Sequence, residues 1–150
     1  MTVPRGTPAL AGILAALISC GPALAQNMPD QALTPGVVAS TDTAEVCGYV
    51  DGLSYSKRHR ATTLEMKREV RRRYGITGYW RGEIDHRAPL CVGGADVVEN
   101  LWPQADFRAK DELEAQVCRA VCHGQMTLQQ GQAIFLGDWR GHLSEKGGGQ

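Results

Sequence analysis

Residues 83–104 have the sequence EIDHRAPLCVGGADVVENLWPQ, and this stretch decides the fold that we expect. Two prolines and a pair of adjacent glycines divide it into short apolar pieces, a pattern typical of short strands and tight turns. A helical pattern follows over about 106–122, because apolar residues recur there at every fourth position (Leu113, Val117 and Val121). The sequence therefore predicts a small antiparallel hairpin that leads into a helix.

Two further helices are predicted, one on each side of this unit. The first covers about 62–74 and begins with a capping box at Thr62. The second begins with another capping box, formed by Thr127 and Gln130, and ends near residue 137. We therefore expect an α+β fold, in which flanking helices surround a small antiparallel hairpin and its helix.

The hairpin carries the residues with the clearest chemistry. Asp85 and His86 are adjacent, and Asn100 follows His86 by 14 residues. Successive side chains of a strand point to opposite sides, so a carboxylate can hold a hard divalent cation while the next residue activates water. A neutral imidazole is a suitable base near pH 7, and the cation stabilises negative charge on a phosphate. The pattern favours a one-metal phosphodiesterase.

The order of these motifs resembles that of the HNH (ββα-metal) endonucleases, in the form found in small exported bacterial proteins. The similarity continues through AKDELE at 109–114 and VCHGQMTL at 121–128, and it covers about 45–140. The resemblance implies that His86 is the general base, Asp85 the metal-binding carboxylate and Asn100 the residue whose side chain pins the hairpin loop. It also implies one divalent ion, with Mg²⁺ as the first choice, and a nucleic-acid substrate, DNA before RNA. Phosphate contacts give affinity without sequence choice, so we expect a nonspecific enzyme.

The third position of the motif departs from the family. It falls on the helix about nine residues after Asn100, at Ala109, whose side chain cannot bind a metal. Asp106 and Asp111 are the nearest carboxylates, although helix geometry directs them away from the standard position. Two functions therefore stay open: an exported metal-dependent nuclease, or a catalytically degenerate module that keeps the fold as a binding or scaffold protein.

Charge is balanced over the whole chain but unevenly distributed. The formal net charge is zero, yet 57–73 holds eight Lys and Arg against two Glu. This pattern predicts a positive face that binds nucleic acid through phosphate contacts. We expect Arg71, Arg72, Arg73 and Arg87 to make such contacts. The alternative is an ordinary solvated helix face, because the two glutamates are placed to pair with nearby basic residues.

The first 25 residues resemble a secretory signal, with an apolar run followed by Ala23-Leu24-Ala25. A lipoprotein signal ending at Cys20 is the minor alternative, and both predict export to the periplasm or beyond. No later apolar run is long enough to span a membrane. We expect 26–44 to be a flexible lead-in, 45–140 the nuclease-like domain and 141–150 a flexible tail. The sequence identifies no inhibitor or partner protein.

Four cysteines remain after the predicted signal, an even number that favours two disulfides in a small exported chain. Sequence alone allows three connectivities. Within the arrangement that the HNH resemblance implies, Cys47 pairs with Cys122, which ties the start of the domain to the long helix. Cys91 then pairs with Cys118, which joins the hairpin loop to the same helix. A Cys118–Cys122 bond is disfavoured, because side chains one helical turn apart meet disulfide geometry poorly.

Overall fold

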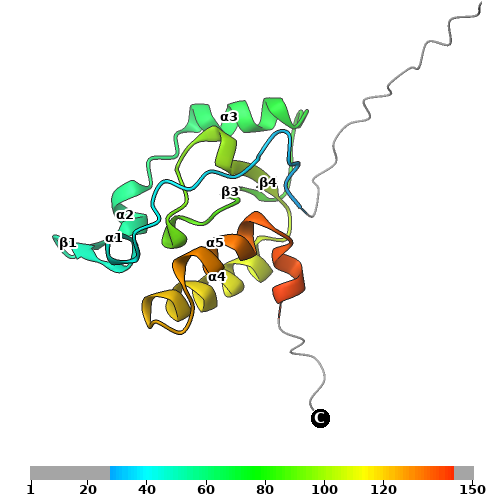
Figure 1. The fold of residues 1–150 in the computed structure, drawn as a ribbon. Helices are drawn as coiled ribbons and strands as arrows, with labels where there is room; N and C mark the ends of the chain where they lie inside the picture. The colour runs from blue at the N-terminus through cyan, green and yellow to red at the C-terminus, as the bar shows by residue number, and fades with distance from the viewer. Residues whose placement is uncertain (1–27, 144–150) are drawn as a thin grey trace, which may run out of the picture.

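The structure is a computed structural model that describes residues 28–143. The predicted signal and most of the predicted tail lie outside this range. A two-stranded hairpin, β3 (Glu83–His86) and β4 (Leu101–Gln104), lies in the middle of the molecule (Figure 1). Helix α3 (Leu64–Arg73) covers one side of it, and α4 (Phe107–Cys122) and α5 (Leu128–Leu136) lie on the other side. The predicted α+β fold is confirmed.

The central hairpin is antiparallel, with Asp85 opposite Trp102 and His86 opposite Leu101. Its long connection contains two short 3₁₀ helices, η1 (Leu90–Val92) and η2 (Val98–Asn100). The two glycines between them are required by close packing. Gly93 has a left-handed φ of 81°, and a Cβ at Gly94 would collide with the carbonyl oxygen of Ala88. This connection therefore depends on glycine at both positions.

The helix boundaries agree with the predicted ranges to within a few residues. At α3 the capping residue is Thr63, whose hydroxyl accepts from the amide of Met66, and not the predicted Thr62. At α5 the predicted capping box is present, since Thr127 and Gln130 each accept a hydrogen bond from the other's amide. Helix α4 leads directly from the hairpin, as predicted.

The segment before α3 contains elements that the sequence pattern did not predict. Helix α1 (Thr43–Cys47) is followed by a small hairpin of β1 (Tyr49–Val50) and β2 (Leu53–Ser54). Helix α2 (Tyr55–His59) comes next, and the 3₁₀ helix η3 (Trp139–His142) closes the described chain. These elements have five residues or fewer, too short for a periodic pattern to reveal them.

Buried apolar residues form two clusters. The helical core joins α1, α2, η1, α4, α5 and η3, and its largest side chain is Trp139. The hairpin core lies between α3 and β4, where Trp102 packs with Val70, Tyr74 and Leu101. Both tryptophans are 1% exposed. The hairpin core thus holds the strands against α3, and the helical core holds the hairpin connection through Val92 of η1.

Residues 28–42 pack against the domain, so the prediction of a flexible lead-in is wrong for this part. The amides of Ala39 and Ser40 donate to the carbonyl of Gly93, at 2.8 and 3.1 Å. Thr34 is fully buried, and its hydroxyl lies 2.7 Å from that of Tyr74. Composition gave no sign of this because backbone hydrogen bonds, and few apolar side chains, hold the segment.

The two disulfides have the predicted connectivity. Cys47 pairs with Cys122 across a Cα–Cα distance of 5.3 Å, and Cys91 pairs with Cys118 across 5.8 Å. Both bonds end on α4, so they tie that helix to α1 and to the hairpin connection. Over residues 28–143, the helices are all too short or too polar to cross a membrane.

Candidate active site

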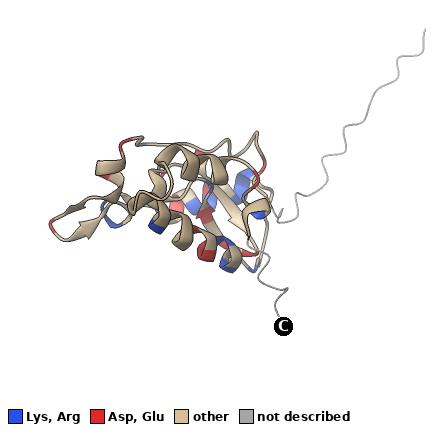
Figure 2. Ribbon diagram, turned by 60° about the horizontal axis from the view of Figure 1, so that its bottom comes forward, with Lys and Arg blue, Asp and Glu red and all other residues tan. Residues whose placement is uncertain are grey.

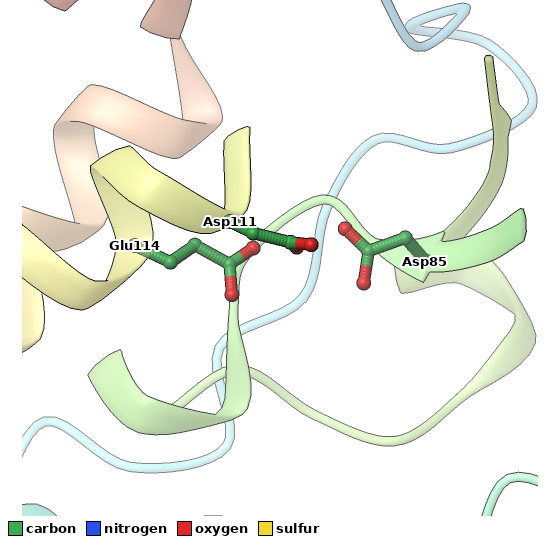
Figure 3. A group of neighbouring side chains, drawn as sticks. All are labelled: Asp85, Asp111 and Glu114. Carbon is green, nitrogen blue, oxygen red and sulfur yellow. The ribbon is translucent and has the colours of Figure 1, made fainter. Parts of the chain in front are cut away.

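Three carboxylates meet where the hairpin faces α4. Asp85 projects from β3, while Asp111 and Glu114 project from α4, and their oxygens point toward one another (Figure 3). One oxygen of each lies within 4.8 Å of the others. Residues 111 and 114 are one helical turn apart and so share a face of α4. We call Asp85, Asp111 and Glu114 the acidic cluster.

A lysine lies inside this cluster. Lys110 is fully buried, and its Nζ donates to Oδ2 of Asp85 at 2.6 Å and to Oε1 of Glu114. Its ammonium also lies 5.6 Å from the centre of the Phe135 ring. Burial alone lowers the pKa of Lys110, but the charges of Asp85 and Glu114 outweigh it and the net pKa is raised. The lysine is therefore a permanent cation at neutral pH.

One ammonium does not balance the negative charge around it. Burial, together with the nearby charge of Asp85, raises the pKa of Asp111 and of Glu83. For Glu114, burial and the charge of Asp85 outweigh the opposing effect of Lys110 and raise the pKa to about 7. Figure 2 shows acidic and basic positions close together around the hairpin and the helix in front of it. The site has an excess of carboxylate that a further cation would relieve.

His86 lies beside the cluster but is largely enclosed, with 3% of its surface exposed. Its Nε2 is 2.9 Å from Oδ1 of Asp96, and its Nδ1 is 4.0 Å from Oδ1 of Asp85. Burial lowers the pKa of His86, and Asp96 and Asp85 oppose that effect only in part. The imidazole is therefore neutral at pH 7, the form in which it can accept a proton.

Asn100 is fully buried and holds the long connection of the hairpin. Its Oδ1 accepts from the amides of Ala88 and Val37, at 2.9 and 3.2 Å. Its Nδ2 donates to the carbonyls of Ala88 and Ala95, at 2.9 and 2.8 Å. The side chain thus uses its whole hydrogen-bonding capacity on backbone groups. Asn100 supports the position of the strand that carries Asp85 and His86, and within residues 28–143 its side chain forms no hydrogen bond with either of theirs.

Arg87 does not face the site. It is 6% exposed, and its guanidinium donates to the carbonyl of Thr34 at 2.8 Å and to that of Leu136. Strand β3 ends at His86, so strand alternation does not direct Arg87 toward α4, and the backbone carbonyls around its guanidinium hold the side chain away from the site. This buried guanidinium is not available for the predicted phosphate contact, and it ties Thr34 to the end of α5.

The basic residues of α3 are only partly available. Arg72 and Arg73 both pair with Glu69, at 2.8 and 2.9 Å, and this pairing lowers the pKa of Glu69 to about 2. Arg71 donates to the carbonyl of Gly78. Two exposed neighbours, Lys67 and Arg68, have no ion pair within 28–143, and the sequence analysis did not single them out.

These two residues line a groove between α3 and β3 with a volume of about 650 Å³. Trp80, Ile76 and Ile84 supply apolar walls, and Glu83 of β3 also lines the groove. The groove therefore lies between the basic helix and the strand that carries Asp85, and none of the three residues of the acidic cluster lines it. Arg71 and Arg72 also line it, whereas Arg73 instead contacts Glu99 at 3.1 Å.

The third motif position, Ala109, packs against the helical core and offers no ligand. Of the two nearest carboxylates, Asp111 belongs to the acidic cluster and Asp106 does not. The prediction missed Lys110 and Glu114, although they are four residues apart and so one turn from each other on α4. It also missed Asp96. The sequence holds no signal for this residue, because its partner His86 lies ten residues earlier in the chain.

A scan of protein-family models found none that matches this chain, and searches of curated proteins and of solved structures found no match either.

Proposed function

We propose that this chain is a metal-dependent phosphodiesterase of the HNH type that cuts nucleic acid. The observation that carries the proposal is the meeting of Asp85 with Asp111 and Glu114 beside a neutral His86, on a hairpin that leads into a helix. Asp111 and Glu114 come from the helix that holds the third motif position. They supply the ligand set that Ala109 lacks.

The donor set fits a hard divalent ion. Carboxylate oxygens are the ligands that Mg²⁺ and Mn²⁺ prefer, and the raised pKa values of Asp111 and Glu114 reflect charge that a cation would neutralise. Asp85, Asp111 and Glu114 would hold the ion, with Lys110 competing for two of them. When bound, the ion supplies positive charge that stabilises a phosphate in its transition state.

The other roles belong to residues of this chain. His86 accepts the proton of the attacking water through Nδ1, the ring nitrogen on the side of Asp85. Lys67 and Arg68 hold phosphates of the substrate in the groove between α3 and β3. Contacts of this kind give affinity without sequence choice, so we expect a nonspecific nuclease.

The test is a nicking assay on supercoiled plasmid, and in parallel on RNA, with the mature disulfide-bonded protein. We expect cleavage with Mg²⁺ and none with EDTA. His86→Ala should lower the rate by about 10² or more, as expected for loss of a general base. Asp85→Asn should raise the metal concentration required, whereas His123→Ala, which changes an exposed histidine at the end of α4, should cut normally. The absence of metal-dependent cleavage, or full activity in His86→Ala, would refute the proposal.

A second function is favoured by a specific observation, the fully buried Lys110 at 2.6 Å from Asp85. Its ammonium can take the structural place of a metal, which would leave a metal-free module that binds a nucleic acid, an envelope polymer or a protein. The two functions differ in one measurable respect. The nuclease binds a divalent ion at Asp85, and the metal-free module does not.

Export is part of the proposal and is supported by the disulfides. Two bonds in a chain of 150 residues are typical of proteins that fold in an oxidising compartment. We infer that the mature protein acts in the periplasm or outside the cell. Expression of the full chain in its host, followed by fractionation and N-terminal sequencing, tests this: a new N-terminus near residue 26 supports export by the predicted signal, and an intact Met1 in the cytoplasm refutes it.

A further inference from the structure

Asp96 lies between η1 and η2 and is nearly enclosed, with 6% of its side chain exposed. Besides His86, two groups just before α3 bind its carboxylate. The hydroxyl of Thr62 donates to Oδ1 at 2.5 Å, and the amide of Ala61 donates to Oδ2. These hydrogen bonds outweigh the effect of burial and lower the pKa of Asp96. The carboxylate is thus a fixed anion that can only accept hydrogen bonds.

A fixed acceptor determines where the imidazole carries its proton. Nε2 of His86 lies 2.9 Å from Oδ1 of Asp96, so Nε2 must be the protonated nitrogen of the neutral ring. Nδ1 then keeps its lone pair. That nitrogen has no hydrogen-bond partner in residues 28–143 and faces Oδ1 of Asp85 at 4.0 Å. The proton-accepting atom is therefore directed toward the acidic cluster.

We propose that Asp96 is a positioning residue for His86, which it holds as the Nε2–H tautomer with Nδ1 free to accept a proton. This role rests on the proposed function, because His86 needs a free nitrogen only if it acts as a base. The carboxylate also joins the base to the chain that enters the basic helix, through Ala61 and Thr62. The orientation of the imidazole is therefore linked to the position of α3.

A purely structural tie between the α2–α3 loop and the hairpin connection predicts different behaviour. Such a tie would affect stability without affecting the tautomer of His86. Thr34→Val offers a matched control, since Thr34 is also a buried polar tie between distant segments and does not touch His86. Asp96→Asn is the test variant, because an amide has nearly the shape of the carboxylate but can donate as well as accept.

The experiment is long-range ¹H–¹⁵N correlation NMR of the imidazole nitrogens. It uses the full mature chain with both disulfides intact, at a single pH at which all the histidines are neutral. We expect the wild type and Thr34→Val to show Nε2 protonated and Nδ1 unprotonated for His86. Asp96→Asn should show a mixture of both tautomers. A wild-type protein with mainly Nδ1–H, or an Asp96→Asn variant with the wild-type pattern, would overturn the inference without any activity measurement.

Turnover supplies the second readout. We expect Asp96→Asn to lower kcat at least tenfold with KM nearly unchanged, because the base is misoriented while substrate contacts on α3 remain. Thr34→Val should keep its kcat. An inactive wild type with the expected tautomer would refute the proposed function alone. An active wild type whose kcat is unchanged in Asp96→Asn would refute the role of Asp96 alone.

Discussion

Replacement of Lys110 by methionine tests the energetics of the acidic cluster. Methionine keeps most of the apolar stem of the lysine, so packing near Phe135 changes little, and only the charge is lost. Breaking a buried ion pair by removing one partner costs about 3 to 5 kcal/mol. We expect a loss of about 3 kcal/mol in the free energy of unfolding, the lower end of that range, because water still reaches the carboxylates that lose their partner. The side chains of Asp85 and Glu114 are 18% and 22% exposed.

The assay is urea unfolding of disulfide-intact protein in EDTA, followed by tryptophan fluorescence. Lys57→Met is the matched control: Lys57 is exposed on α2, and its replacement should change the free energy of unfolding by about 0.5 kcal/mol or less. A loss below about 1 kcal/mol in Lys110→Met would refute the argument, since the ammonium would then contribute little to the cluster.

Repeating the unfolding with Mg²⁺ separates the two candidate functions. In Lys110→Met the ion no longer competes with an ammonium for Asp85 and Glu114, so we expect tighter binding than in the wild type. A ligand at a hundred times its Kd adds about 2.7 kcal/mol to the free energy of unfolding. Equal stabilisation of both proteins by Mg²⁺ would show that Lys110 does not compete for the ligands, and no stabilisation of either would favour the metal-free module.

Three further predictions concern the surface and the hairpin. Arg72 and Arg73 lower the folded-state pKa of Glu69, so this carboxylate stabilises the fold above pH 4.5 and loses that effect as the pH falls toward 2. Glu69→Gln should abolish this pH-dependent part of the stability. Acid titration by circular dichroism checks this, and an acid-unfolding curve equal to that of the wild type would contradict it. Substituting both Lys67 and Arg68 with Gln should weaken DNA binding in fluorescence anisotropy and reduce its salt dependence, whereas an unchanged salt slope would mean that the groove does not bind phosphates. Gly94→Ala should lower the unfolding midpoint strongly, because the new Cβ would collide with the carbonyl oxygen of Ala88. A midpoint equal to that of the wild type would refute that packing.

Part of this molecule follows directly from sequence patterns. The paired glycines and the spacing of Asp85, His86 and Asn100 predicted a hairpin that leads into a helix, because turn chemistry and strand alternation are local properties. The disulfide connectivity that the HNH resemblance implied is also present, and helix geometry by itself excluded only a bond between Cys118 and Cys122.

The parts that were missed depend on long-range contacts. The sequence around Lys110 is polar and gives no sign that this lysine is buried. Its role becomes visible only in the fold, where Asp85 lies opposite it. Arg87 follows His86 directly, yet its side chain lies among buried backbone carbonyls. The ordered segment before α1 is held by backbone hydrogen bonds, which leave no pattern in side-chain composition.

Calorimetric titration of the mature chain with Mn²⁺, alongside Asp85→Asn, tests the central claim most directly. Mn²⁺ accepts the same oxygen ligands as Mg²⁺ and binds such sites more tightly. We predict one saturable site per chain in the wild type and its loss, or a large fall in affinity, in Asp85→Asn. Wild-type protein without saturable binding, or with binding that Asp85→Asn leaves unchanged, would contradict the claim that the acidic cluster holds a catalytic metal ion.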